Sequence, residues 1–324
     1  MRAALAMAPA MVPFVFGDDG LARLRELVEI DTAVVMTSAD DLGPDERASV
    51  ELLITGWGAP WLGKEVLETL PALRAIVHWG GGVGFLDEAA AVRGIAVSTA
   101  RVVNALPVAE FTMAMITLAA KDAFWVSRRY CAEQRYIDRE AALPHTGLVG
   151  SVVGIVGAST IGTLVVELLA DRGVEVLVYD PYLGSEHAAA MGVELVGTVE
   201  SLARRSQILS IHAPATPETD GMISREVLAA LPDGATVINT ARGSLVDQES
   251  LVAELEAGRL RAILDVTEPE VLPAGHPLYS LPNVFLTPHI AGSTGRELRR
   301  LGRSALDEVA RLVAGEPFEH PFHV

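Results

Sequence analysis

Three side chains in the second half of the chain are of the types that carry out acid–base chemistry on a small acid. Arg242 follows an apolar run, and a guanidinium is a planar, permanently charged partner for a carboxylate. His289 follows Thr287-Pro288, and an imidazole can exchange a proton near neutral pH. Glu270 could bond to one ring nitrogen, orient the imidazole and favour its charged form. Each also has an ordinary interpretation, as a surface arginine, a structural histidine and a surface glutamate.

The stretch 152–180 predicts a strand, a tight turn, a helix and a second strand. An apolar run ends at Gly157, an amphipathic segment begins near Gly162, and a second apolar run ends at Asp180. In such a unit the free N–H groups of a helix N-terminus face a pyrophosphate. A carboxylate 18 residues after Gly162 can accept bonds from both ribose hydroxyls and repel a 2′-phosphate. The stretch therefore favours NAD over NADP, although an ordinary βαβ unit with a glycine turn has the same outline.

The glycine pattern of this turn departs from G-x-G-x-x-G at its middle position, which is Ser159. The Ser159 hydroxyl could donate to a phosphate oxygen, or its Cβ could hold the cofactor away. The turn alone is therefore a weak indication of nucleotide binding.

A second glycine-rich loop, Gly80-Gly81-Gly82-Val83-Gly84, also follows an apolar run. Exposed backbone N–H groups there could hold a small anion, or the glycines could serve a tight connection that needs positive φ. Trp57 and Trp79 flank the loops of this region, which indicates an apolar or aromatic substrate tail, or core packing. Few basic residues lie near these loops, so a phosphorylated substrate is not expected.

The elements that must position these residues alternate between strands and helices, which predicts parallel sheets covered by helices, with ligands at the carboxyl ends of the strands. Strands are expected at 12–16, 33–36, 52–55, 75–79, 95–97, 207–212, 236–239, 261–266 and 284–287. Helices are expected at 21–28, 63–69, 87–92, 248–257 and 294–314. A further apolar helix should reach Lys121, with Asn104 just ahead of it and Pro107 in its first turn, either in a core or in a subunit contact. The polar stretch 128–147 is expected to be an irregular arm or linker.

The composition limits the class of protein. The chain has 324 residues, half of them hydrophobic, and a formal net charge of −17. Nucleic acid and anionic membranes are not expected partners, since both attract basic surfaces. The single cysteine, Cys131, allows no internal disulfide and suits the cytoplasm. Pro9 and Pro13 interrupt a signal-like N-terminal run, and no continuous apolar stretch approaches the 18 or so residues of a membrane helix.

Taken together, five segments resemble the D-isomer-specific 2-hydroxyacid dehydrogenase family. They are residues 157–162, 211–219, 238–247, 264–270 and 283–292, and Pro107-Val-Ala-Glu110 fits the family's helix that enters the nucleotide domain. The first hundred residues match only loosely. The resemblance implies an NAD-dependent enzyme that moves a hydride between the nicotinamide and a 2-oxo or D-2-hydroxy acid, similar to a glyoxylate or hydroxypyruvate reductase.

The resemblance also implies roles for individual residues. Arg242 would bind the substrate carboxylate together with the N–H groups of Gly81 and Gly82, and Trp57 would line the substrate site. His289 would give its proton to the carbonyl oxygen, oriented by Glu270. The residues implied for cofactor binding are Gly157, Ser159, Thr160, Ile161, Gly162, Asp180, Ala213, Pro214, Thr219, Thr240, Ala241 and Asp265, the last of which would face the nicotinamide carboxamide. No metal is implied.

The domain order implied by the family is split. Residues 1–101 and 293–324 would form a flavodoxin-like substrate-binding domain, and residues 102–292 an inserted Rossmann NAD-binding domain. Both would be doubly wound parallel α/β sheets, with a homodimer as the usual assembly and a cleft that closes on the substrate.

Several positions depart from the family pattern or separate its branches. Thr160 stands where an arginine often follows, and Val271 where a proline is common. Glu270 argues against the formate dehydrogenase branch, and no regulatory domain is expected after residue 324. An NAD(H)-sensing scaffold, like the family's corepressor relatives, is the alternative function. An S-adenosylmethionine methyltransferase would share the glycine turn but leaves Arg242, Glu270 and His289 unexplained.

Overall fold

The computed structural model describes residues 1–323 and divides the chain into two compact α/β units. Unit 1 contains Met1–Asn104 and the segment from Ser293 onward, and unit 2 contains Ala105–Gly292. The chain thus leaves unit 1 for unit 2 and then returns to it. The division expected after residue 101 is three residues earlier than the observed one, and both positions lie within one helix.

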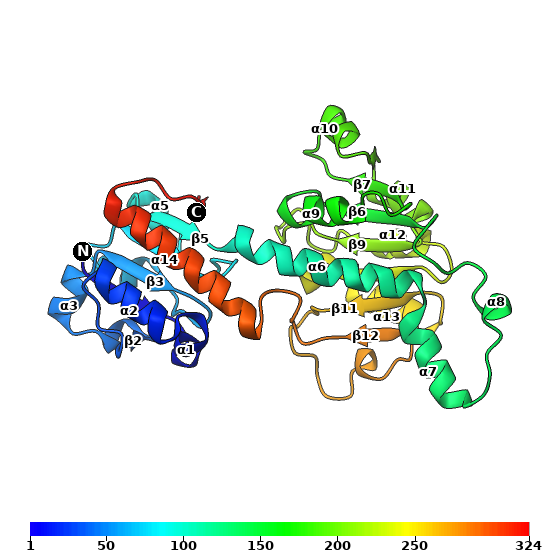
Figure 1. Cartoon of the computed structure of the whole chain (residues 1–324), viewed down its shortest axis with the longest axis horizontal. Coiled ribbons are helices and arrows are strands. Elements are labelled where there is room, and N and C mark those ends of the chain that lie inside the picture. Colours follow the sequence, from blue (N-terminus) through cyan, green and yellow to red (C-terminus); the bar gives the residue numbers. More distant parts are fainter. Residues whose placement is uncertain (324) are drawn as a thin grey trace. The chain divides into compact units, whose positions relative to one another are not determined.

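Unit 1 is built on a six-stranded sheet in the order β13-β5-β4-β3-β1-β2. Figure 1 labels β2, β3 and β5 of this sheet. Strands β1 to β5 are parallel, and β13 is antiparallel to β5. The strands are β1 (Ala3–Ala6), β2 (Val35–Met36), β3 (Leu52–Thr55), β4 (Ala75–His78), β5 (Ala96–Thr99) and β13 (Pro321–Phe322). The helices are α1 (Val12–Val15), α2 (Gly17–Leu27), α3 (Pro44–Ser49), α4 (Lys64–Glu68), α5 (Ala89–Val92) and α14 (Leu298–Ala314).

Both faces of the unit 1 sheet are covered, because side chains alternate between two buried clusters. Leu52 and Ile54 pack with α2 and α14, whereas Leu53 between them packs with α4 and α5. Near-continuous apolar strands are typical of a parallel sheet with helices on both faces.

The first strand was predicted at the wrong place. Residues 12–16 form helix α1 and its C-cap, and β1 is the alanine-rich segment Ala3–Ala6. Pro9 begins a 3-10 turn (Pro9–Met11), and Pro13 lies in the first turn of α1, where a missing N–H is tolerated. Val12, Val15 and Phe16 therefore face the core from a helix and its C-cap, not from a strand.

Unit 2 is built on a seven-stranded parallel sheet in the order β12-β11-β10-β9-β6-β7-β8. The strands are β6 (Val152–Val156), β7 (Glu175–Tyr179), β8 (Glu194–Leu195), β9 (Ile208–Ile211), β10 (Thr236–Asn239), β11 (Arg261–Leu264) and β12 (Val284–Leu286). The helices that connect and cover them include α9 (Thr160–Leu169), α10 (Ser185–Ala190), α11 (Val199–Arg205), α12 (Arg225–Ala230) and α13 (Gln248–Glu256). The chain winds outward in one direction from β6 and in the other from β9, so the sheet is doubly wound and its switch point lies between these two strands.

Helix α6 (Arg101–Ala120) leads from unit 1 into unit 2, and its start differs from the prediction. Asn104 and Pro107 lie inside the helix, not ahead of it and in its first turn. Ala109, Ile116 and Ala119 pack against β6 and α9, so α6 is a core helix of unit 2. By length and mean hydropathy (1.6) it is also the one helix of residues 1–323 that could span a membrane, although polar residues interrupt its apolar run.

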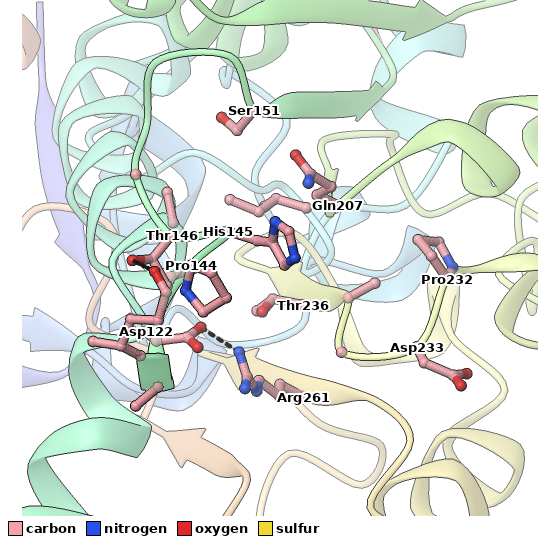
Figure 2. A pocket seen from close by; sticks show the side chains of 18 residues that line it. Asp122, Pro144, His145, Thr146, Ser151, Gln207, Pro232, Asp233, Thr236 and Arg261 are labelled. Carbon is pink, nitrogen blue, oxygen red and sulfur yellow. Dashed lines mark hydrogen bonds and ion pairs between the residues drawn. The ribbon is translucent and has the colours of Figure 1, made fainter. Parts of the chain in front are cut away.

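The segment 128–147, predicted to be an irregular arm, contains the second part of helix α7 (Ala123–Glu133) and all of helix α8 (Arg139–Ala142). It borders a hollow of about 380 Å³ at the amino ends of the strands, between Ser151, Gln207, Thr236 and Arg261 (Figure 2). Arg261 in this hollow is paired with Asp122. The hollow lies at the edge of the sheet opposite the strand ends that carry Arg242, Asp265 and His289.

Candidate active site

The turn that carries Arg242 follows β10 and is held by two sets of contacts, one from Asn239 and one at Gly243. The Asn239 side chain accepts a bond from the Ala241 N–H (3.0 Å) and donates to the Arg242 carbonyl (2.8 Å). A Cβ on Gly243 would overlap the backbone at Thr267, so only glycine lets this turn pack on the segment that leads to Glu270. Arg242 is exposed, and its guanidinium donates to the Ala241 carbonyl (2.6 Å).

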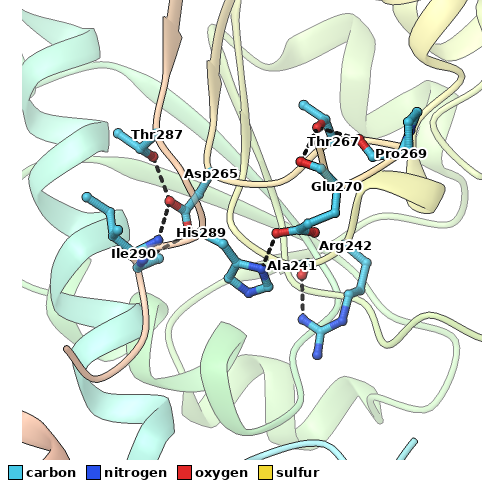
Figure 3. A network of polar contacts seen from close by, with 10 residues as sticks. Ala241, Arg242, Asp265, Thr267, Pro269, Glu270, Thr287, His289 and Ile290 are labelled. Carbon is cyan, nitrogen blue, oxygen red and sulfur yellow. Dashed lines mark hydrogen bonds and ion pairs between the residues drawn. The ribbon is translucent and has the colours of Figure 1, made fainter. Parts of the chain in front are cut away.

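The imidazole of His289 is bonded to Glu270 as predicted. The distance from His289 Nδ1 to Glu270 Oε1 is 2.6 Å, and both side chains are about half exposed. With Nδ1 directed to the carboxylate, Nε2 is left for a ligand. Figure 3 shows the His289 ring and the Arg242 guanidinium projecting to the same side of unit 2. Glu270 and His289 also line a hollow of about 450 Å³ along β12.

Asp265, expected to face the cofactor, is buried and directs its carboxylate to the segment that carries His289. One oxygen accepts bonds from the Thr287 hydroxyl (2.6 Å) and the Ile290 N–H (2.8 Å), and the other accepts from the Ala291 N–H (2.8 Å). The Asp265 carbonyl accepts from the His289 N–H (2.9 Å). These bonds hold the loop that carries the histidine (Figure 3).

The turn between β6 and α9 has the shape that a dinucleotide requires. Gly157 has a φ of +89°, and a Cβ there would lie 2.7 Å from the Ala213 nitrogen. A Cβ on Gly162 would overlap the Gly157 carbonyl, so this glycine allows the helix to start directly against the strand. The turn thus brings the N-terminus of the ten-residue helix α9 to the switch point of the sheet. The residues fit the pyrophosphate of a dinucleotide.

Ser159 is the N-cap residue of α9, and its side chain is exposed. It has extended backbone angles, and among the described residues its hydroxyl makes no capping bond to the helix. The hydroxyl is therefore free to donate to an anion at the helix N-terminus, where the N–H groups of Thr160 and Ile161 also lie.

Asp180 stands directly after β7 and braces the glycine turn. Its carboxylate accepts bonds from the Ala158 N–H and the Tyr182 N–H, both at 2.8 Å. A carboxylate has lone pairs for about four bonds, so two acceptor positions remain for ribose hydroxyls.

The other residues predicted for the cofactor lie after β9 and β10. Ala213 is buried against Gly157, and Thr219 donates to the Pro214 carbonyl (2.6 Å), which closes the loop after β9. The Thr240 hydroxyl is 2.9 Å from that of Thr112 in α6, so it ties β10 to the core helix, and Ala241 begins the Arg242 turn.

The residues predicted for the substrate are divided between the two units: Arg242 lies in unit 2, and Gly81, Gly82 and Trp57 lie in unit 1. Trp57 is 42% exposed, whereas Trp79 is fully buried and belongs to the core. The alternative that Gly80–Gly84 needs positive φ is wrong, since none of its glycines has one. In the part of the chain that the structure describes, the N–H groups of Gly81 and Gly82 donate to no protein acceptor.

Sequence reasoning missed the residues that hold the site in place. Asn239 and Gly243 shape the Arg242 turn, Thr287 bonds to Asp265, and Gln248 exchanges two bonds with the Glu268 backbone (2.7 and 3.0 Å). The only available signal was their position within or next to the segments that resemble the family. The described residues contain no cluster of three or more His, Cys, Asp or Glu arranged to hold a metal ion.

The doubly wound sheet, the glycine turn at its switch point and the polar strand ends define a dinucleotide-binding protein of the oxidoreductase type. Residues 113–291 match the model of the family described as "D-isomer specific 2-hydroxyacid dehydrogenase, NAD binding domain". The chain belongs to this family, and NAD is the cofactor of unit 2.

Two relatives and one solved structure indicate how far the similarity extends. A D-3-phosphoglycerate dehydrogenase of Methanocaldococcus jannaschii is 32% identical over 94% of this chain and 57% of that protein, so the chain spans little more than half of its length. A glyoxylate reductase of Korarchaeum cryptofilum is 30% identical over 92% of this chain and 90% of that protein. The structure of Rhodotorula graminis D-mandelate dehydrogenase is 25% identical, covers 100% of this chain and 98% of its own, and superimposes with a TM-score of 0.83.

Proposed function

We propose that the protein reduces a 2-oxo acid to a D-2-hydroxy acid with NADH, or catalyses the reverse oxidation. The observation that carries this proposal is the His289–Glu270 pair, bonded at 2.6 Å on a loop that Asp265 anchors beside the turn of Arg242. Such a pair is a general acid ready to protonate a carbonyl oxygen.

In the proposed mechanism, each polar group acts on a different part of the substrate. Arg242 binds the carboxylate in a planar, charge-assisted contact and polarises the adjacent carbonyl. His289 donates the proton on Nε2 to the carbonyl oxygen, while Glu270 stabilises the imidazolium from Nδ1. Gly81 and Gly82 offer their N–H groups to the same carboxylate. The Gly157–Gly162 turn and Asp180 would hold NADH, which supplies the hydride when it is bound.

We propose a small, unphosphorylated substrate such as glyoxylate or hydroxypyruvate, and NADH in preference to NADPH. The loops 56–61 and 79–87 contain no lysine or arginine to pair with a phosphate. The Korarchaeum glyoxylate reductase is a relative over nearly its whole length. Asp180 supports the NADH preference, since a carboxylate repels a 2′-phosphate. We further propose that the protein works as a homodimer in the cytoplasm.

The replacement His289→Gln tests the proposal. We expect the turnover of NADH with a 2-oxo acid to fall by about 10²–10⁴, because general acid catalysis contributes about that factor. The NADH dissociation constant should stay within a factor of about two, since His289 is not part of the pyrophosphate turn. His187→Gln, at an exposed histidine of α10, is the matched control and should keep its activity. Full activity of His289→Gln would contradict the assignment.

A panel of glyoxylate, hydroxypyruvate, pyruvate, branched 2-oxo acids and phenylpyruvate, each with NADH and with NADPH, identifies the substrate. Glyoxylate or hydroxypyruvate should give the highest kcat/KM. A protein that binds NADH tightly but oxidises it with none of these acids would be an NAD(H)-sensing scaffold. A clear NADPH preference would contradict the role proposed for Asp180.

A further inference from the structure

The glycine loop of unit 1 is packed against a buried histidine, His78. This residue ends β4, two positions before Gly80, and is 2% exposed. A Cβ on Gly80 would lie 2.5 Å from His78 Nε2 and 3.1 Å from the Trp57 indole nitrogen. Glycine at position 80 therefore lets two ring nitrogens approach the loop backbone closely.

Gly81 and Gly84 in the same loop have no such requirement. A Cβ on Gly81 would make only ordinary contacts near 3.8 Å, and one on Gly84 would meet nothing within 4 Å. Neither has a positive φ. What their lack of a side chain provides is access to the backbone N–H groups, which is the property an anion-binding loop needs.

His78 is held from its other side by the neighbouring strand. Thr55, the last residue of β3, pairs in register with His78, and its hydroxyl is 3.0 Å from Nδ1. The ring packs against Phe85 (centroids 4.9 Å apart) and lies nearly parallel to Trp79 (6.5 Å). Its position is therefore fixed by β3 and by the two ends of the glycine loop.

The Nε2 atom of His78 is buried and, among residues 1–323, forms no hydrogen bond that meets normal geometry. Burial lowers the pKa of His78 to about 4, against a smaller raising effect of the Gly82 backbone, so the ring is neutral near pH 7. A buried polar atom without a partner costs about 1–3 kcal/mol. If packing were the only purpose, phenylalanine would fill the space without that cost.

We propose that His78 is a positioning residue for the Gly80–Gly84 loop: when the loop binds a substrate carboxylate, Nε2 donates to the loop backbone and keeps the Gly81 and Gly82 N–H groups directed at that carboxylate. The Thr55 hydroxyl donates to Nδ1, which places the ring proton on Nε2, and the Gly82 carbonyl is the acceptor that Nε2 gains when the loop binds an acid. The inference rests on the proposed function, since it assigns the loop to the substrate carboxylate.

Three replacements separate this role from packing. His78→Phe keeps a ring but no nitrogen, His78→Gln places an amide near the position of Nε2, and His78→Asn places one near Nδ1 only. The probe is oxamate, an unreactive analogue of a 2-oxo acid, titrated by calorimetry into the protein saturated with NADH. Melting temperature and the NADH dissociation constant are measured for every variant.

We expect His78→Phe and His78→Asn to raise the oxamate dissociation constant about tenfold or more, as the loss of one oriented hydrogen bond does. His78→Gln should stay within about threefold of the natural protein, and NADH binding should not change. In turnover the loss should appear in KM more than in kcat. Equal oxamate affinity in all variants, or equal losses in the Gln and Asn variants, would overturn the proposal.

If His78→Phe does not fold, the comparison of Gln with Asn still decides, together with Thr55→Val, which removes the hydroxyl that sets the ring proton. A natural protein that binds oxamate but turns over no 2-oxo acid would refute the proposed function and leave the test of His78 valid. A natural protein that binds NADH but no oxamate would overturn the inference itself.

Discussion

At the scale of single residues, the site depends on one buried carboxylate. His289 has a φ of +54°, a left-handed conformation that costs a residue with a Cβ about 1–2 kcal/mol. The bonds of Asp265 to Thr287, Ile290 and Ala291 enclose His289 on both sides and hold it in that conformation. The orientation of the acid is thus set by the backbone of its loop as well as by Glu270.

The replacement Asp265→Asn should weaken both the loop and catalysis. An amide has one accepting oxygen, so its NH₂ group would face backbone or hydroxyl donors, and we expect the free energy of unfolding to fall by about 2–3 kcal/mol. Turnover should fall by about tenfold or more as His289 loses its place. Urea unfolding and steady-state kinetics measure the two effects. Thr287→Val is the milder control, because it removes one donor to Asp265 and leaves the two N–H bonds. If Asp265→Asn loses no more stability and turnover than Thr287→Val, the role of Asp265 in holding the loop is contradicted.

At the scale of elements, one tight constraint is the contact between the end of β6 and the start of α9 at Gly162. The replacement Gly162→Ala places a methyl group in the Gly157 carbonyl, and backbone cannot yield as a flexible side chain can. We expect a loss of about 2 kcal/mol or more in unfolding free energy and a large loss of NADH affinity. Gly197→Ala, where a Cβ meets nothing within 4 Å, is the matched control. Comparable stability and NADH affinity in both variants would show that the turn is not packed as described.

Ser159, at the N-terminus of α9, is positioned to contact the pyrophosphate of the cofactor. Its hydroxyl is exposed and does not cap the helix in residues 1–323, so it can donate to the pyrophosphate. Ser159→Ala and Ser159→Gly should therefore both weaken NADH binding, by about five- to tenfold, in a fluorescence titration. Tighter binding of the glycine variant would mean that the Cβ of Ser159 hinders the cofactor.

The elements that could be predicted were those with a repeated local pattern. The apolar strands β3, β4, β9 and β10 and the turn at Gly157 follow directly from the residues, because parallel strands buried on both faces are continuous apolar runs. The start of the chain was not predictable in this way, since Ala3–Ala6 has weak strand propensity and becomes a strand through its pairing with β3. The Asp265 bonds and the His78–Thr55 contact join residues that are distant in the sequence, so no local pattern carries them.

At the scale of the whole molecule, each unit buries a histidine at the carboxyl end of its sheet. His78 ends β4 in unit 1, and His212 follows β9 in unit 2 with Nε2 2.9 Å from the Ser210 hydroxyl. Burial lowers the pKa of both to about 4. Each unit therefore contains a buried imidazole, neutral near pH 7, at the carboxyl ends of its strands.

This arrangement predicts a loss of stability in mild acid. Below pH 6.5 the unfolded chain takes up a proton at each of these histidines, whereas the folded units do so only near pH 4, so stability falls as the pH is lowered between these values. The loss should approach about 2–3 kcal/mol for each histidine. His212→Gln keeps a polar group for Ser210 but cannot titrate. Because the acidic surface titrates alike in both proteins, the difference between their unfolding free energies isolates His212. The unfolding free energy is measured with denaturant at intervals from pH 7 to pH 4.5. Over this range the natural protein should lose about 2–3 kcal/mol more stability than the variant. Parallel curves would contradict the prediction, because they would mean that His212 takes up its proton at the same pH in the folded and the unfolded protein.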